Sequence, residues 1–203
     1  MRIDRIINTV FTSNTYVLQE EESLDCWLID LGDWTPVMDI VGNRRIAGVF
    51  FTHIHFDHIY GILQLLDNFP ECFVYTSEFG KLALASSKLN FSKYHEEQII
   101  IEVEPVNLRI LHDGDKVILN ENSVIEVFET PGHDMSCLTY RLGNVLFSGD
   151  SMIPGVKTIT SLPRSNKIDA VKSEKLIKEL WKECYIYPGH GEFHILFDNC
   201  LKN

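Results

Sequence analysis

The chain has 203 residues, of which 45% are hydrophobic, and its formal net charge is −11. This length and apolar content can build a buried core, and without repeats or linkers we expect one domain over residues 1–203. The acidic balance argues against a nucleic-acid partner, since binding to phosphates needs a basic face. No apolar run approaches the roughly 20 residues that span a bilayer. The first residues lack the apolar stretch of an export signal, so we predict a cytoplasmic protein with no membrane partner.

The hydrophobic pattern predicts strands and helices along the whole chain. The expected strands cover residues 16–18, 26–29, 48–52, 72–75, 108–110, 116–119, 124–128, 138–142, 145–147 and 184–187. The expected helices cover residues 35–41, 59–69, 78–87 and 169–181. Strands followed by helices in two similar halves indicate two sheets with helices outside them. The five cysteines are scattered and form no Cys-x-x-Cys pair, so we expect reduced, mostly buried thiols.

The strongest signal is the segment His53-Ile54-His55-Phe56-Asp57-His58, which follows a predicted strand. Alternate residues of an extended segment point the same way, so His53 and His55 can reach one metal ion. Asp57 and His58 are expected at a helix start, where their side chains project to the adjacent side. The segment therefore predicts two pairs of ligands for two ions.

Three further loops each combine a strand end, a glycine and a side chain that can bind a metal. They are Thr130-Pro131-Gly132-His133, Phe147-Ser148-Gly149-Asp150 and Tyr187-Pro188-Gly189-His190-Gly191. Glycine allows the sharp turn that fixes the next side chain. Any one of these loops alone is an ordinary turn, but five of the eight histidines fall in the four motifs together. His95, His112 and His194 are left as ordinary histidines.

These residues resemble the metallo-β-lactamase superfamily, in particular the glyoxalase II-like hydrolases. Their His-x-His-x-Asp-His signature is followed by a histidine, an aspartate and a histidine, and all seven positions match here. The resemblance runs from Asp30 to His190 and implies an αββα sandwich of two mixed sheets with helices outside.

The resemblance also implies the ligand assignment. His53, His55 and His133 would bind the first metal, Asp57, His58 and His190 the second, and Asp150 would bridge both. Asp30 matches a family aspartate near the site, where it would support a ligand, although a residue that caps a turn is an equal reading.

Nitrogen and oxygen ligands without thiolate suit two Zn²⁺, while iron or manganese also fits the set. In such a site a bridging hydroxide would attack a carbonyl, with Asp57 and Asp150 as the catalytic carboxylates and Asp57 as a proton shuttle. The expected reaction is hydrolysis of a small-molecule thioester, ester or lactone, as in hydroxyacylglutathione hydrolases.

Glyoxalase II carries a C-terminal helical domain that binds glutathione. We expect this chain to lack that domain after His190. The substrate-binding residues are therefore unknown from the sequence. Residues 81–95, with Lys88, Phe91, Lys93 and Tyr94, are a candidate cleft wall or a solvated helix. Arg164 and Lys157 could attract a carboxylate or form plain surface charge.

Other functions share the motif. An iron-dependent persulfide dioxygenase would hold one iron on His53, His133 and Asp150, and its pattern around residues 132–140 is similar. A β-lactamase-like enzyme fits less well because such enzymes are usually exported, and an RNA-processing nuclease is opposed by the acidic charge. A flavodiiron protein would carry Glu at position 55. A metal-binding module without turnover is the last alternative.

Overall fold

The computed structural model describes residues 1–96, 98–101, 103 and 106–193. The chain divides into two compact units, residues 1–110 and 111–203, and each contains one sheet. In the described part of the chain, no helix combines the length and the apolar character required to traverse a membrane.

The first unit contains a six-stranded mixed sheet in which the order of the strands follows the chain. Its strands are β1 (Arg2–Ile7), β2 (Asn14–Gln19), β3 (Asp25–Ile29), β4 (Arg45–Phe50), β5 (Phe73–Thr76) and β6 (Leu108–Ile110). The pairs β1–β2 and β2–β3 are antiparallel, and β3 to β6 are parallel. Helices α1 (Trp34–Val41), α2 (Ile62–Asn68) and α3 (Glu78–Leu84) and the short 3₁₀ turns η1 (Phe56–His58) and η2 (Ser92–Tyr94) lie between the strands in sequence.

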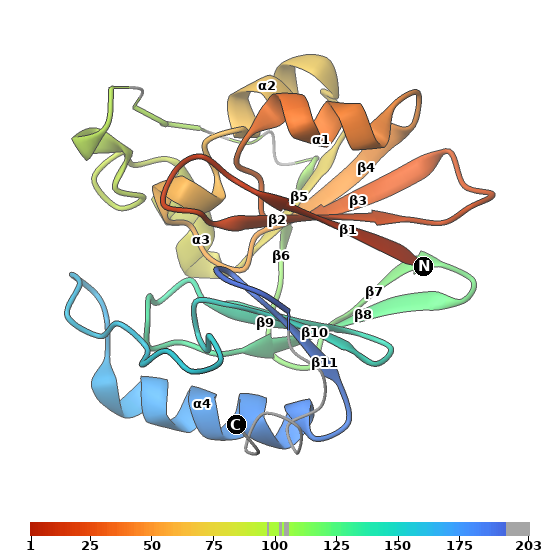
Figure 1. The fold of residues 1–203 in the computed structure, drawn as a ribbon. Coiled ribbons are helices and arrows are strands. Elements are labelled where there is room, and N and C mark those ends of the chain that lie inside the picture. The colour runs from red at the N-terminus through yellow and green to blue at the C-terminus, as the bar shows by residue number, and fades with distance from the viewer. Residues whose placement is uncertain (97, 102, 104–105, 194–203) are drawn as a thin grey trace. The chain divides into compact units, whose positions relative to one another are not determined.

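The core of this unit forms where the helices cover the sheet, and α1 and α2 are seen on one face of it in Figure 1. Val37 of α1 and Leu65 of α2 belong to one buried cluster with Val17, Leu28 and Val49 of the sheet. All five side chains are fully buried. Burial of a side chain of this size contributes roughly 1.5–3 kcal/mol, so this packing holds the strand ends that carry the motif.

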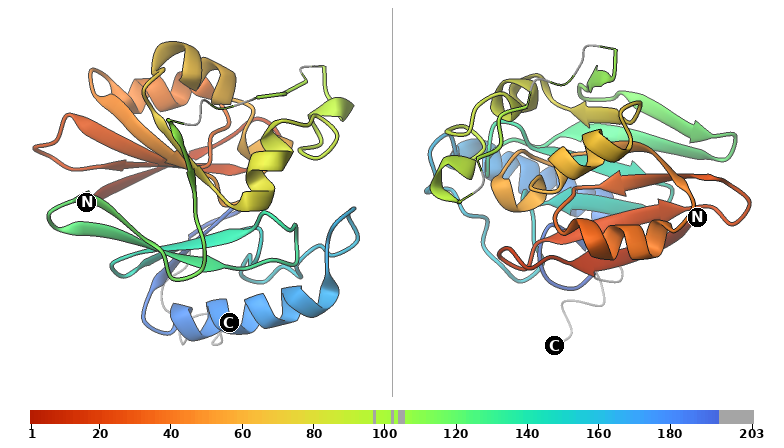
Figure 2. Two further views of the ribbon diagram at one scale, coloured as in Figure 1. Left: turned by 180° about the vertical axis from the view of Figure 1, so that it is seen from behind. Right: turned by 90° about the horizontal axis from the view of Figure 1, so that it is seen from above.

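The second unit contains a five-stranded mixed sheet in the order β11-β10-β9-β8-β7. Its strands are β7 (Lys116–Asn120), β8 (Ser123–Glu129), β9 (Leu138–Leu142), β10 (Val145–Gly149) and β11 (Tyr185–Pro188). Helix α4 (Lys167–Trp181) lies along this sheet (Figures 1 and 2), and its Ile177 and Trp181 pack on Leu146 and Ile186. Asn166 caps the helix by accepting hydrogen bonds from the backbone N–H groups of Ile168 and Asp169.

Every predicted strand and helix has a counterpart, with differences at the ends. The predicted helix 59–69 is a 3₁₀ turn at 56–58 followed by α2 from Ile62, so Asp57 and His58 lie in η1 and not in an α-helix. Strand β1 and turn η2 were not predicted. The predicted single domain remains a prediction.

Candidate metal centre

The first group of predicted ligands lies where two parallel strands end. Strand β3 pairs in parallel with β4, so the carboxyl ends of both lie at one edge of the sheet. Asp30 follows β3, and the segment 51–58 follows β4. Backbone hydrogen bonds join the two loops, from Asp30 N to Phe50 O at 3.0 Å and from Leu31 N to His58 O at 2.8 Å. Residues 20 or more positions apart in sequence are thereby fixed beside each other.

Asp30 is the centre of a buried hydrogen-bond network. Its Oδ1 accepts from Thr52 N at 2.7 Å, and its Oδ2 accepts from Thr52 Oγ1 at 2.7 Å and lies 2.9 Å from His58 Nδ1. The pKa of Asp30 is raised because burial outweighs the lowering by the charge and hydrogen bond of His58 and by the bonds from Thr52. Three convergent donors match an ionised carboxylate, which can only accept. Asp30 therefore contacts the Nδ1 side of the His58 ring, opposite the Nε2 atom that faces Asp57.

The same network orients His53. Because the Thr52 hydroxyl gives its one proton to Asp30, its oxygen must accept from His53 Nδ1, 3.2 Å away. The Nδ1 atoms of His53 and His58 are both donors in this arrangement. Each ring then presents its Nε2 lone pair as the ligand atom, as is usual for metal-binding histidines.

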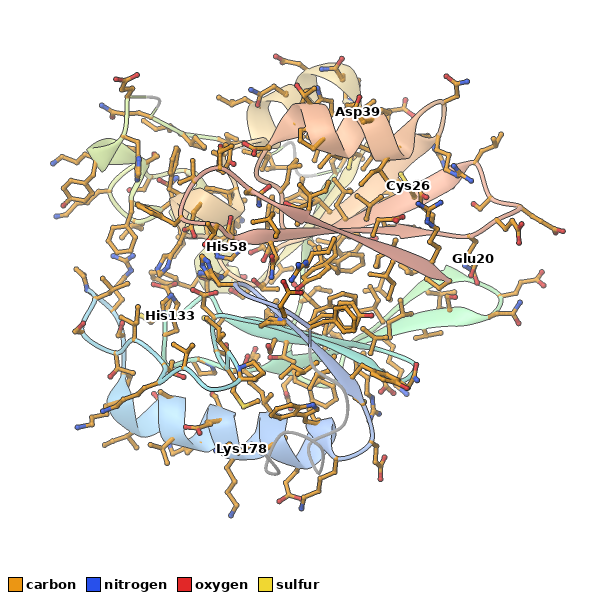
Figure 3. The ribbon with its side chains drawn as sticks, in the orientation of Figure 1. Glu20, Cys26, Asp39, His58, His133 and Lys178 are labelled. Atoms are coloured by element: carbon orange, nitrogen blue, oxygen red, sulfur yellow. The ribbon has the colours of Figure 1, made fainter. Side chains whose placement is uncertain are left out.

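The remaining members of the motif lie next to these rings. The His53 ring centroid is 4.6 Å from that of His55 and 4.3 Å from that of His58. Asp57 Oδ2 is 3.3 Å from His58 Nε2. One potential ligand atom of each of Asp30, His53 and His58 lies within 4.8 Å of the others. The structure thus brings the whole first motif together in a buried cluster, where His58 is labelled in Figure 3.

A buried polar network that was not identified from the sequence contacts the backbone of the motif. Ser13 Oγ donates to the carbonyl of Asp57 at 2.6 Å. Asn8 Nδ2 donates to Ser13 Oγ and Thr15 Oγ1, and its Oδ1 accepts from Asp33 N. Single polar residues in a loop give no sequence signal for such a network. It matters because it fixes the backbone of the turn that carries Asp57.

The second group of predicted ligands lies at one edge of the other sheet. Strand β9 is antiparallel to both β8 and β10, and β11 is parallel to β10, so β8, β10 and β11 run in the same direction. His133, Asp150 and His190 follow these three strands. Asp150 Oδ2 lies 3.6 Å from His133 Nε2 and 3.4 Å from His190 Nε2. Asp150 therefore faces both histidines, as a bridging ligand would.

Residues of the loop between β10 and α4 fix the position of His133, which is labelled in Figure 3. His133 Nδ1 lies 3.1 Å from the Ile159 carbonyl, which can only accept, so Nδ1 is the donor. The lone pair that can bind a metal is then on Nε2, which faces Asp150. Ser165 Oγ donates to the His133 carbonyl at 2.7 Å. Arg164 Nε lies 3.4 Å from Asp134 Oδ2, with the arginine side chain only 17% exposed. Arg164, a candidate substrate contact in the sequence, thus faces a carboxylate of its own chain.

The donor set of each unit has the chemistry of a metal-binding site. The first unit gathers imidazole and carboxylate groups, the second gathers two imidazoles around a carboxylate, and neither ligand group contains a thiolate. Nitrogen and oxygen ligands of this kind suit zinc, iron or manganese. Of the remaining histidines, His95 stacks on Phe56, His112 lies 3.7 Å from Glu129 and is exposed, and His194 lies outside the described residues.

Comparison with known proteins agrees with this chemistry. The sequence profile of the Metallo-beta-lactamase superfamily matches residues 8–190, so the chain belongs to this superfamily. A hydroxyacylglutathione hydrolase of Hydrogenovibrio crunogenus is 26% identical over 188 residues, which cover 90% of this chain and 60% of that protein.

Two solved structures are similar in fold. The BLEG-1 B3 metallo-beta-lactamase superposes with a TM-score of 0.83 and 24% identity, over 95% of this chain and 93% of that one. TTHA1623, solved in a di-iron-bound form, gives a TM-score of 0.74 and 22% identity, over 95% and 94% of the two chains. The predicted fold class, an αββα sandwich, is confirmed by this likeness.

The curated relatives are longer than this chain. It covers 60%, 64% and 47% of three hydroxyacylglutathione hydrolases. Membership of the superfamily supports the general class predicted from the sequence, a metal-binding hydrolase.

Proposed function

We propose that this chain is a metal-dependent hydrolase of a small-molecule thioester, ester or lactone. The observation that carries the proposal is the oriented set of histidines. His53, His58 and His133 each direct Nδ1 to an acceptor, so that Nε2 is the nitrogen whose lone pair can bind a metal. Relatives named hydroxyacylglutathione hydrolase, at 26–28% identity, support the reaction class.

The ligand set that we propose is the one implied by the family motif. His53, His55 and His133 would hold one ion, Asp57, His58 and His190 would hold another, and Asp150 would contribute to both. We propose two Zn²⁺, with iron or manganese as the alternatives. When bound, such a pair supplies an acidified water and polarises a carbonyl group.

The chain's own residues would then position the reactants and accept the proton of the attacking water. We assign to Asp57 the orientation of the attacking water and the acceptance of its proton, since its carboxylate is 12% exposed and its backbone is fixed by Ser13. Asp30 and Thr52 keep two imidazoles in the tautomer that binds through Nε2. His133 is held in the same tautomer by the Ile159 carbonyl.

The substrate that we propose is a small molecule and not a nucleic acid or a membrane component. The net charge of −11 makes the surface a poor match for polyanions. A cytoplasmic location remains a prediction.

The decisive experiment measures metal content and turnover on the same preparation. We expect about two metal ions per chain, hydrolysis of at least one compound in a panel of acyl-thioesters, esters and lactones, and loss of hydrolysis on chelation. Hydrolysis that is unchanged after exhaustive chelation would contradict the proposal. One iron per chain with oxygen uptake on a persulfide would replace it by the dioxygenase alternative.

A further inference from the structure

Aromatic side chains from three separate segments meet beside the histidine motif. The Phe91 ring centroid lies 4.9 Å from that of His55. His95 stacks on Phe56, with centroids 3.9 Å apart and planes at 17°, and the Phe11 ring meets His95 edge-on at 5.8 Å. The loop between β1 and β2 and the segment around η2, both at the same end of the first unit in Figure 1, are joined by these contacts.

Two of these segments hold bulky residues in an unfavourable backbone conformation. Phe11, Thr12 and Phe91 have φ angles of 51°, 55° and 65°. Such a conformation costs a bulky residue free energy and persists only where surrounding contacts impose it. Strain of this kind gathers at functional sites, where it presents a side chain in a required position.

Buried hydrogen bonds impose both conformations. Around Phe11, Asn8 N donates to Ser13 O at 2.8 Å, and Ser13 Oγ donates to Asp57 O. Around Phe91, Asn90 Oδ1 accepts from Ser92 N, and Ser92 Oγ accepts from Ile99 N at 2.7 Å. The rings are therefore presented by anchored loops.

The outer rings of the group face solvent. Phe11 is 66% exposed and Tyr94 is 72% exposed, and the Tyr94 ring lies 6.4 Å from that of Phe91. A single exposed aromatic residue needs no explanation. Two series of ring contacts reach the histidine motif, Phe11–His95–Phe56 and Tyr94–Phe91–His55. They do need one, because together they offer the kind of surface on which an apolar group of a ligand packs.

We propose that Phe11, Phe91, Tyr94 and His95, the aromatic shelf, bind an aryl or similarly apolar acyl group of the substrate. The inference rests on the proposed hydrolase and specifies the class of acyl group that it accepts. Aromatic rings attract one another in offset or edge-on geometry beyond the area they bury. A short polar acyl group would gain none of these contacts. The enzyme would therefore prefer a phenylacetyl thioester to an acetyl thioester of the same thiol.

The test compares binding of phenylacetate and acetate to the metal-loaded protein by calorimetry, which requires no turnover. Both probes share the carboxylate, so their ratio of dissociation constants isolates the ring. We expect phenylacetate to bind roughly tenfold or more tightly than acetate. We expect the ratio to fall toward one in Phe11→Asn, where asparagine tolerates the left-handed backbone, and in Tyr94→Ala.

Leu24→Ala provides a matched control, because Leu24 is 77% exposed and lies in the β2–β3 turn outside the shelf. It should retain the wild-type ratio. Equal affinity of the wild type for both probes, or an unchanged ratio in both shelf variants, would overturn the proposal. Tyr94 does not have a positive φ. Its variant therefore serves as the test if Phe11→Asn does not fold.

Measuring kcat/KM for the phenylacetyl and acetyl thioesters tests the aromatic shelf and the proposed hydrolysis separately. If phenylacetate binds selectively but neither thioester is hydrolysed, the shelf stands and the proposed thioester hydrolysis fails. If both thioesters are hydrolysed with equal kcat/KM and the binding ratio is one, the reaction stands and the shelf fails.

Discussion

Asp30 links two of the predicted ligand histidines through one carboxylate. It contacts His58 directly and reaches His53 through the hydroxyl of Thr52. Asp30 itself has a φ of 55°, an unusual conformation that aspartate and asparagine tolerate best. We expect Asp30 to fix the orientation of the two rings and not to bind metal itself.

Asp30→Asn should lower metal affinity roughly 10- to 100-fold, the usual effect of losing a group that supports a ligand. Asparagine tolerates the backbone conformation but removes the charge that binds the His58 proton. Competition with a chromophoric chelator measures the change, and thermal unfolding of the metal-free protein serves as its control. Affinity equal to that of the wild type would remove the supporting role of Asp30.

Asp57→Asn should reduce kcat by roughly 10²- to 10⁴-fold if this carboxylate moves the proton of the attacking water. Metal content must be measured alongside, because Asp57 is also a proposed ligand. A variant that keeps both ions and full turnover would exclude the assignment to Asp57.

Gly132 shows how an element can depend on one position. Its φ is 142°, and a Cβ built there would lie 2.3 Å from both Cα and N of Ala170 in α4. The turn that carries His133 therefore packs directly against the backbone of this helix. Asn166 N, next to the helix start, also donates to the Gly132 carbonyl at 2.8 Å.

Gly132→Ala should destabilise the protein by at least about 1–3 kcal/mol, since backbone strain adds to a collision with main-chain atoms that cannot rotate away. Gly143→Ala is the matched control, because Gly143 also has a positive φ but no atom within 4 Å of the added Cβ. Chemical denaturation measures both. Equal effects of the two substitutions would show that the contact with α4 is unimportant.

The strands β7, β8 and β9 share a charged trio. Glu126 of β8 lies opposite Lys116 of β7 on one side and opposite Arg141 of β9 on the other side. Hydrogen bonds from Lys116 and Arg141 lower the pKa of Glu126 below its ordinary value. Stability from this trio is present above the unfolded pKa of about 4.3 and is lost as the pH falls through the lower folded value.

Glu126→Gln should therefore be less stable than the wild type at neutral pH, with the difference disappearing in acid. Urea unfolding at neutral pH and well below pH 4 tests the prediction. A difference that persists unchanged in acid would show that the charge of Glu126 is not the cause.

Local sequence signals predicted most of these elements. The loops at 130–133, 147–150 and 187–191 were found because glycine and a ligand follow an apolar strand. Strand β1 was missed because it lies at the sheet edge and carries Arg2, Asp4 and Arg5, as edge strands often do. The extra residues of α4 come from the cap at Asn166, which the periodicity of apolar residues does not report.

Contacts between distant residues could not be predicted in the same way. The motif at 53–58 identified candidate ligands, but Thr52, Ser13 and Asn8 gave no signal, because their roles depend on partners many residues away. The contact of Phe91 with His55 depends on a left-handed backbone that no local pattern indicates.

At the scale of the whole molecule, the described cysteines are buried thiols in both units. Cys26, Cys72, Cys137 and Cys184 form no disulfide. Burial raises the pKa of Cys26 and of Cys72 to about 12, and it also raises the pKa of Cys137 and Cys184. The thiolate, which is the reactive form, is therefore scarce at neutral pH.

These four thiols should resist iodoacetamide in the folded protein and react after unfolding in denaturant. Mass spectrometry of peptides after timed labelling resolves each position. Rapid labelling of Cys26 or Cys137 in the native protein would contradict their burial.

In both sheets, neighbouring strands follow one another in sequence, from β1 to β6 and from β7 to β11. Within each sheet, every strand hydrogen-bonds to the one made just before it. The connections differ in length, because helix α4 lies between β10 and β11, and closing a long connection of this kind is the slower step of folding. A nascent chain leaving the ribosome could extend each sheet one strand at a time, with the amino-terminal sheet complete before the other begins.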